Sequence, residues 1–348
     1  MKKNYLLALS AVLASTMVLT SCSSGGKSSG STSGGKSETR NLLTNLVGEN
    51  GPVLAVKIDD TQPAHPQIGL EKADVVYIEQ VEGGLSRIAA IYSDPTRLPD
   101  LIGPVRSARI SDLDILAQYG HVGFAFSGAQ TKFYPLINAA NLTNLSADRN
   151  PATIYSRDTT RFAPTNLILH PHELMDSVVK NGKQVDTVKS IGFTFGPTPS
   201  GGTPITSVSF HWPASRYSAS WSKSLNQWLL KYNGQPDLAA DGSHLGSPTL
   251  IIQNVSITDS QFKDRHGGVT PFSNTVGSGT AYLLRDGLAI PILWNRPSAE
   301  EGTTWTTTDG KPANMGTGQI WIALTDNVPS FTYPASPTPA ATSTPASK

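Results

Sequence analysis

The second half of the chain consists of short segments that alternate apolar and polar residues, and this pattern constrains the fold more than any other feature. Turn-forming dipeptides separate the segments, among them Asn233-Gly234, Asp286-Gly287 and Asp309-Gly310. A period of two residues indicates half-buried strands, and Asn-Gly and Asp-Gly favour tight hairpins. The predicted strands are 205–212, 217–222, 227–232, 249–257, 279–284, 288–294 and 319–324. We therefore expect a β-rich sandwich or barrel-like domain over residues 191–333.

The preceding part, residues 41–190, combines strand patterns with helix patterns. Strands are predicted at 53–58, 74–81, 85–92 and 121–126, and helices at 107–119, 131–140 and 171–180. Pro171 lies in the first turn of the last helix and Gly182 follows its end, as helix boundaries prefer. This alternation predicts a layered domain of α/β type. With the β-rich part, the chain is expected to be an α+β protein whose two domains have separate cores.

The N-terminus has the pattern of a secretory signal. Lys2 and Lys3 precede an apolar run, residues 5–19, that is too short to span a membrane, so residues 1–21 are predicted to be a signal peptide. The only cysteine, Cys22, follows Leu19-Thr20-Ser21 in a context that resembles a bacterial lipobox. We expect Cys22 to carry lipid, palmitate included, and to anchor the protein at the extracytoplasmic face of the cell membrane. The alternative is an ordinary signal peptide with a chance cysteine.

Two further segments have compositions that cannot form a packed core. Residues 22–40 are rich in Ser and Gly, which predicts a flexible tether behind the lipid. Residues 334–348 alternate Pro, Ala, Ser and Thr, which predicts a disordered tail.

Charge and cysteine content exclude several classes of function. The formal net charge is +1, whereas nucleic-acid-binding modules carry a strongly basic face, so no nucleic-acid partner is expected. A single cysteine excludes a disulfide framework, a Cys-based zinc site and an iron–sulfur cluster. The sequence contains no P-loop, dinucleotide-binding fingerprint, nucleophile elbow or zinc-protease motif. We therefore predict neither a metal site nor a cofactor.

The most informative stretch is 57–112, which is dense in charge although only 15% of the chain is charged. Gly103-Pro104 is predicted to turn directly into a helix that carries Arg106, Ser107 and Arg109. Backbone N–H groups at that helix start, together with the guanidinium groups, would bind an anion. Alternatively, the arginines pair with Asp112 and nearby carboxylates in a structural network. Spacing alone does not separate these interpretations.

A predicted hairpin adds charged residues to the same region. With Gly83-Gly84 as a two-residue turn, Glu82 and Arg87 share one face of the sheet and Glu79 points to the other. A regular hairpin therefore prevents Glu79 and Glu82 from acting together as the carboxylate pair of a glycosidase. Glu82 at the turn, or Asp59 at a strand end, remains a candidate for a lone general acid.

These motifs resemble those of the YerB-like lipoproteins, a family of bacterial envelope proteins with a domain of unknown function. The resemblance rests on residues 56–59, 66–70, 73–79, 81–87, 103–109, 155–158, 161, 163–164, 166, 276–279, 287, 294, 309–310 and 316–321. The chain departs from the family pattern at Asp60, where Asn is expected, and at Thr165, where His is expected. The resemblance implies a two-domain surface lipoprotein, and it implies no established reaction.

The resemblance favours the anion site, because envelope polymers such as peptidoglycan and teichoic-type chains carry carboxylates or phosphates. The expected ligand-binding residues are Glu82, Gly83, Gly84, Arg87, Arg106, Ser107 and Arg109. The leading hypothesis is a membrane-anchored lipoprotein that binds an anionic cell-wall glycan or peptide as a binding or accessory module. One alternative is a peptidoglycan-cleaving enzyme with Glu82 or Asp59 as its lone general acid. Another is a scaffold that binds an envelope protein through its β-rich domain.

Overall fold

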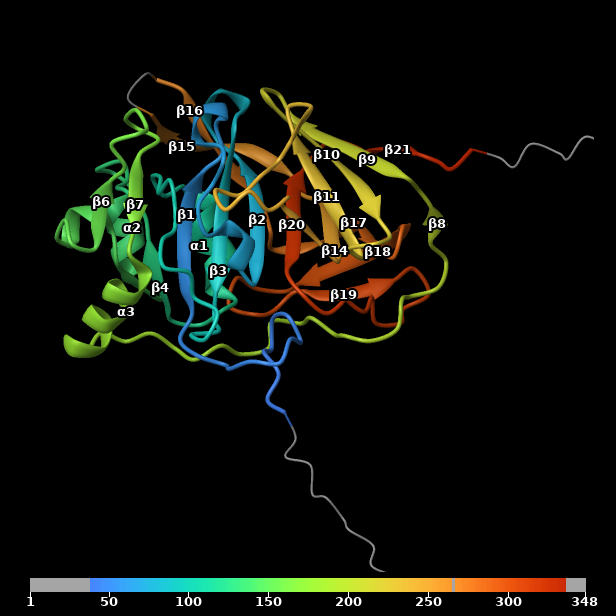
Figure 1. The fold of residues 1–348 in the computed structure, drawn as a ribbon, viewed down its shortest axis with the longest axis horizontal. Helices are drawn as coiled ribbons and strands as arrows, with labels where there is room; N and C mark the ends of the chain where they lie inside the picture. Colours follow the sequence, from blue (N-terminus) through green and yellow to red (C-terminus); the bar gives the residue numbers. More distant parts are fainter. Residues whose placement is uncertain (1–37, 265–266, 336–348) are drawn as a thin grey trace, which may run out of the picture. The chain divides into compact units, whose positions relative to one another are not determined.

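The computed structural model describes residues 38–264 and 267–335 (Figure 1). The predicted signal peptide, Cys22, most of the tether and most of the C-terminal tail lie outside the described residues.

A mixed sheet of eleven strands runs through the described part of the chain. Its strands are β1 (Leu54–Asp59), β2 (Val75–Gln80), β3 (Ser86–Tyr92), β4 (Val122–Ala125), β5 (Leu142–Asn144), β8 (Thr203–Pro204), β14 (Thr249–Asn254), β17 (Gly277–Arg285), β18 (Leu288–Arg296), β19 (Thr304–Thr307) and β20 (Ile320–Thr325). The order across the sheet is β19-β18-β17-β14-β20-β2-β3-β1-β4-β5, with β8 paired to β18.

A smaller sheet of six strands and two separate hairpins complete the strands. The smaller sheet contains β9 (Ser207–Trp212), β10 (Ser215–Ser222), β11 (Gln227–Tyr232), β12 (Gln235–Pro236), β13 (Gly246–Ser247) and β21 (Ser330–Thr332). The hairpins are β6 (Tyr155–Arg157) with β7 (Leu167–Leu169), and β15 (Ile257–Lys263) with β16 (Val269–Ser273). Each of these sheets ends in edge strands, so within residues 38–264 and 267–335 none closes into the barrel that was one expectation for the β-rich part. The mostly β architecture agrees with an α+β assignment.

The turn dipeptides form the predicted hairpins. Asn233 and Gly234 have φ values of 46° and 84°, and Asp286 and Gly287 have φ values of 53° and 75°. Two consecutive residues with positive φ make the tight turn whose twist suits a hairpin. Arg285 accordingly pairs with Leu288 across a two-residue loop.

Helices occur only in the first half of the described chain. They are α1 (Ile110–Ala117), α2 (Tyr134–Ala139) and α3 (Pro171–Lys180), with short 3-10 turns at 62–64, 70–72, 82–84 and 147–149. The predicted range of α3 is confirmed. The prediction that a helix begins at Ser107 is wrong, since Arg109 is extended (φ −128°, ψ 161°). The segment before α1 pairs with β1 instead, because the Arg106 N–H donates to the Lys57 carbonyl oxygen at 2.8 Å.

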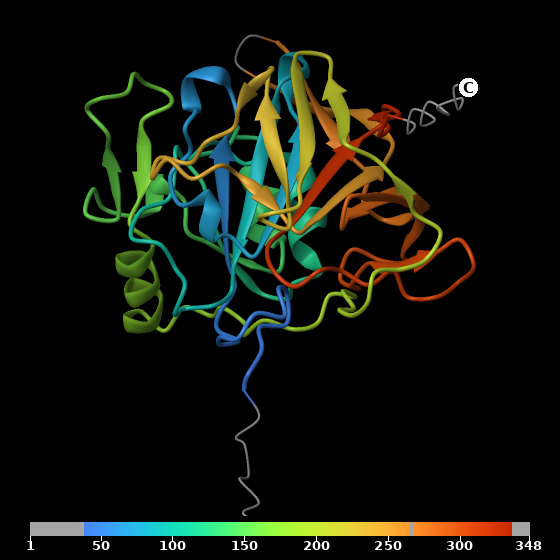
Figure 2. The same ribbon diagram turned by 45° about the vertical axis from the view of Figure 1, so that its right-hand side comes forward.

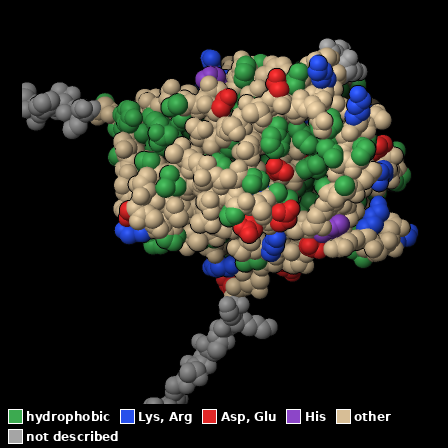
Figure 3. All heavy atoms as spheres, turned by 180° about the vertical axis from the view of Figure 1, so that it is seen from behind, with side chains coloured by type: hydrophobic (Ala, Val, Ile, Leu, Met, Phe, Trp, Pro, Cys, Tyr) green, Lys and Arg blue, Asp and Glu red, His purple; other side chains and the backbone are tan. Residues whose placement is uncertain are grey.

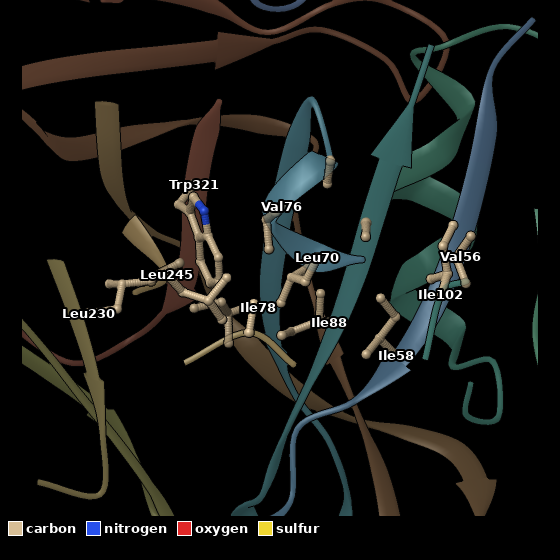
Figure 4. Close-up of a cluster of buried hydrophobic side chains, with 14 of the residues drawn as sticks. Val56, Ile58, Leu70, Val76, Ile78, Ile88, Ile102, Leu230, Leu245 and Trp321 are labelled. Carbon is tan, nitrogen blue, oxygen red and sulfur yellow. The ribbon is translucent and has the colours of Figure 1, made fainter. Parts of the chain in front are cut away.

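The predicted separate cores are wrong, because the two halves of the chain share one sheet and each of the two buried clusters contains residues of both halves. β20 lies between β14 and β2 and is parallel to both (Figures 1 and 2). β2 is buried along almost its whole length, so each of its edges needs a hydrogen-bonding neighbour. β3 supplies one neighbour and β20 the other. Figure 4 shows the result: Trp321, Leu230 and Leu245 pack in the same cluster as Ile78 and Ile88.

The shared sheet predicts a single cooperative unfolding transition. All six tryptophans lie at or beyond residue 212, whereas the helices lie within 110–180. Tryptophan fluorescence therefore reports the second half, and the helical circular dichroism band reports the first. In a urea titration the two signals should have coincident midpoints. Two separated midpoints would show that the halves fold independently despite sharing β2 and β20.

Candidate anion-binding site

Three arginines from neighbouring segments line one cavity. Arg87 is in β3, while Arg106 and Arg109 lie in the extended segment that leads into α1. The cavity has a volume of about 440 Å³. Its lining residues are Arg87, Arg106, Ser107, Arg109, Ala129, Gln130, Pro164 and Asp264. The predicted residues Arg87, Arg106, Ser107 and Arg109 are thus brought together, whereas Glu82, Gly83 and Gly84 are not among the lining residues.

Two of these arginines make ion pairs with buried carboxylates, as the structural interpretation of the motif expects. Arg106 Nε donates to Asp59 Oδ2 at 2.7 Å. Arg109 donates through Nε and Nη2 to Glu82 Oε2 at 2.8 and 2.7 Å. Arg109 Nη1 also donates to the carbonyl oxygens of Ser107 and Ala108. The donors of Arg109 are therefore committed to the protein.

Arg87 and Arg106 keep donors for a ligand. Arg87 is buried and donates through Nη1 to the Ser107 carbonyl oxygen at 3.0 Å, and it has no ion pair with any carboxylate in the described part of the chain. Burial, together with the charges of Arg109 and Arg106, lowers the pKa of Arg87 to about 9. Within the same residues, Nη1 and Nη2 of Arg106 have no protein acceptor. Guanidinium groups in such a setting are stabilised by an added oxyanion.

The helix start itself is closed to an anion. Asp112 Oδ2 accepts the Arg109 backbone N–H at 2.6 Å, and its Oδ1 accepts Lys57 Nζ at 2.7 Å. The carboxylate of the helix's own first turn therefore occupies the position predicted for a bound anion. An anion in the cavity would be bound by side chains.

Beneath the arginines lies a second buried charge cluster. Lys57 Nζ also donates to Glu79 Oε1, and the side chains of Lys57, Glu79 and Asp112 are inaccessible to solvent. Burial raises the pKa of Glu79, with Lys57 opposing and Asp112 reinforcing the change. One ammonium group is thus shared by two carboxylates from different elements, β2 and α1.

The predicted two-residue turn at Gly83-Gly84 is wrong. The Val81 N–H donates to the Leu85 carbonyl oxygen at 2.8 Å, so residues 82–84 form a three-residue turn. In the observed register Glu79 and Arg87 are paired across the two strands, so their side chains lie on the same face of the sheet. The two-residue turn predicts different faces for them. Packing explains the turn: Gly84 has φ +70°, and a Cβ there would lie 2.5 Å from Pro213 Cβ. Gly84 is therefore a packing position against the second half of the chain.

Neither acidic candidate has the environment of a general acid. Burial alone would raise the pKa of Glu82, but the Arg109 charge and hydrogen bonds from Arg109 and Thr270 outweigh it and hold that pKa below its usual value. A general acid needs the opposite shift, so that it keeps a proton to donate. Asp59 is inaccessible to solvent and bound to Arg106.

Sequence reasoning missed a buried network that joins the two halves. His65 Nδ1 lies 2.9 Å from Asp237 Oδ1, and its Nε2 lies 3.3 Å from Asp60 Oδ1. The His65 ring stacks on Tyr232 with a centroid separation of 4.2 Å. Tyr217 donates to Asp60 Oδ1 at 2.7 Å. His65 and Asp237 are 172 positions apart, so no local pattern could indicate their contact.

Two further findings concern residues 38–264 and 267–335 alone. No cluster of three or more His, Cys, Asp or Glu side chains there is arranged to hold a metal ion. None of the helices in this part has the length and apolar character needed to cross a bilayer.

Comparisons with known proteins agree with this architecture. Residues 42–184 match the family described as "Protein of unknown function (DUF3048) N-terminal domain", and residues 207–322 match the corresponding C-terminal domain. The curated protein "Putative lipoprotein YerB" of Bacillus subtilis (strain 168) is 44% identical over 63 residues, a stretch that covers 18% of each chain. The alignment thus spans about a fifth of that relative.

A solved structure extends the likeness to the whole fold. The crystal structure of YerB protein from Bacillus subtilis superposes with a TM-score of 0.71 at 19% identity, and the match covers 85% of this chain and all of that one. At that identity the match shows a common fold. Because the two family domains together cover most of the chain, the protein belongs to the DUF3048 family of YerB-like proteins, whose function is unknown.

Proposed function

We propose that this protein is a lipoprotein of the bacterial envelope that binds an anionic cell-wall glycan or peptide in the arginine cavity, as a binding or accessory module. The Cys22 context and the similarity to a protein named as a lipoprotein support membrane anchoring. The cavity supports an anionic ligand. Basic side chains do not cover the face seen in Figure 3, where they lie mainly toward its edges. That face therefore carries no broad basic surface.

Arg87 is the main support for the proposal, because its buried guanidinium group has no carboxylate partner in the described part of the chain. A buried guanidinium without a carboxylate partner costs folding free energy, and its neighbours Arg109 and Arg106 add repulsion that the charges of Asp59 and Glu82 offset only in part. A bound oxyanion would offset both effects. The cost is consistent with a group that is kept for binding rather than for stability.

A neighbouring turn offers a surface for a sugar ring. Pro164 lines the cavity, and Phe162 in the same turn is 90% exposed. The turn is held in place, since Arg161 donates to the carbonyl oxygens of Ala64 at 2.9 Å and Pro66 at 2.6 Å. An exposed aromatic ring beside donors for an anion suits a charged glycan.

Arg87→Met should weaken binding to purified cell walls by about 1.5–3 kcal/mol, the range for a charge-assisted hydrogen bond. The unfolding free energy should stay the same or rise, because the variant removes an unpaired buried charge and strands no carboxylate. Cosedimentation with purified walls measures binding, and urea unfolding measures stability. Mass spectrometry of the supernatant from the same incubation would detect cleaved wall fragments, which the enzymatic alternative requires.

The matched control is Arg216→Met, an exposed arginine that lines a different cavity. It should leave wall binding unchanged. If Arg87→Met instead destabilises the fold severely while its folded fraction binds normally, the arginines are structural and the proposal fails.

Cys22→Ala tests the anchor. Without a thiol, no acyl chain can be attached, so the variant should move to the aqueous phase of a detergent partition. Ser23→Ala, one residue further along, should remain with the detergent. A Cys22→Ala variant that still partitions with lipid would contradict lipidation at this cysteine.

A further inference from the structure

A second cavity adjoins the arginine cavity. It has a volume of about 540 Å³, and it shares Gln130 and Asp264 with the first. Its lining residues are Gln130, Thr131, Lys132, Gln261, Phe262, Lys263 and Asp264. Because Gln130 and Asp264 line both, the two cavities lie side by side. A ligand longer than a single anion can therefore extend from one into the other.

The wall between the cavities is held by contacts between the two halves of the chain. Gln130 Nε2 donates to Thr270 Oγ1 at 3.3 Å, and Thr270 donates in turn to Glu82. The rings of Phe133 and Phe262 pack at 5.3 Å below it. The second cavity is therefore formed by side chains that pack together from the segment before α2 and from β15.

The second cavity adds cations that the protein leaves unpaired. Lys132 and Lys263 are exposed, and neither ammonium group has an ion pair within the described ranges. The shared acid, Asp264, accepts the Gly268 N–H at 2.8 Å within its own turn. Positive charge thus continues from Arg87 and Arg106 into the neighbouring cavity.

We infer that the ligand of this site is a polymer with repeating phosphodiester groups, one group bound by Arg87 and Arg106 and a further group bound by Lys132 and Lys263. The inference rests on the proposed anion site and names its ligand class. Donors approach the first cavity from β3, from the segment before α1 and from Gln130. The two non-bridging oxygens of a phosphodiester accept hydrogen bonds from several directions, whereas the oxygens of a carboxylate accept mainly in the plane of the carboxylate.

The test compares a monomer with a polymer. The purified full-length protein in mild detergent is titrated with glycerol 3-phosphate and with poly(glycerol phosphate), and calorimetry measures both affinities. Lys132→Gln combined with Lys263→Gln should weaken polymer binding roughly tenfold, because each exposed ion contact contributes a factor of about 2–5. Affinity for the monomer should not change. The salt dependence of polymer binding should also become shallower, as fewer counterions are released.

Matched variants and a second polymer separate the possible results. Lys223→Gln combined with Lys231→Gln removes two exposed lysines, one from the turn after β10 and one from β11, and should have no effect. If the Lys132 and Lys263 changes leave polymer binding intact while Arg87→Met abolishes it, the extended site is wrong and the anion site stands. If Arg87→Met changes the affinity for neither the monomer nor the polymer, both the anion site and the extended site are wrong. Equal affinity for poly-L-glutamate would overturn the assignment to phosphodiesters.

Discussion

Lys57→Met should lower the free energy of unfolding by about 3–5 kcal/mol, the typical loss when one partner of a buried ion pair is removed. Lys57 is the cation that Glu79 and Asp112 share in a solvent-inaccessible cluster. Methionine fills much of the same space, so the loss reports the stranded carboxylates rather than a cavity. Urea unfolding at neutral pH, followed by tryptophan fluorescence, measures the difference.

The pH dependence of this loss provides a second check. Without Lys57, Glu79 avoids a buried charge by taking up a proton, which raises its pKa further. With Lys57 present the pKa of Glu79 is already about 7, so the two proteins differ in the charge of Glu79 only above that pH. The deficit should therefore be largest above pH 7 and should shrink as the pH falls toward 7. Lys311→Met is the control, since Lys311 pairs with Asp309 at 2.8 Å on the exposed surface. It should barely change stability. An equally small loss for Lys57→Met would mean that the cluster is hydrated or already neutral.

His65 should make the protein progressively less stable above neutral pH. Burial alone would lower the pKa of His65, but hydrogen bonds and charge interactions with Asp237 and Asp60 outweigh it and raise that pKa from 6.5 to about 10. Because the folded state holds this proton more tightly, the stabilisation is complete below pH 6.5 and is lost as the pH rises to about 10. The slope should approach 1.4 kcal/mol per pH unit in that window.

His65→Gln should remove that slope and should cost about 3–5 kcal/mol below pH 6.5, since Asp60 and Asp237 lose their cation. Urea unfolding at a series of pH values measures both effects. His172→Gln is the matched control, because His172 is largely exposed and 3.9 Å from Asp100. The free energy of unfolding of this variant should equal that of the unsubstituted protein at every pH. A pH slope that survives in His65→Gln would place the titrating group elsewhere.

Local sequence signals predicted the features that depend on a few neighbouring residues. The range of α3 follows from Pro171 at its first turn and Gly182 after its end. The hairpin at Asp286-Gly287 follows from two residues that tolerate positive φ. The charge-rich stretch also identified Arg87, Arg106 and Arg109 as members of one site, because β3 and the segment before α1 are close in the sequence.

Local sequence signals gave the wrong turn length or helix start where a segment distant in the sequence packs against or pairs with that part of the chain. The turn after β2 has one residue more than the Gly-Gly pattern predicts, because Gly84 packs against Pro213 from the other half of the chain. The helix at Ser107 begins later than predicted, because that backbone pairs with β1.

The sequence by itself determined most of the long strands, the tight turns at Asn233-Gly234 and Asp286-Gly287, and which cations gather near β3. These features depend on side-chain periodicity and backbone preference over short distances. Only the tertiary structure decided that β20 separates β14 from β2, that Asp237 reaches His65, and that β15 walls the groove beside the arginines. The paired residues are far apart in the chain: β20 follows β14 by about 70 positions and β2 by more than 200, and Asp237 follows His65 by 172. Their pairing depends on burying both edges of β2 and on satisfying buried charges, and neither requirement appears in any local pattern.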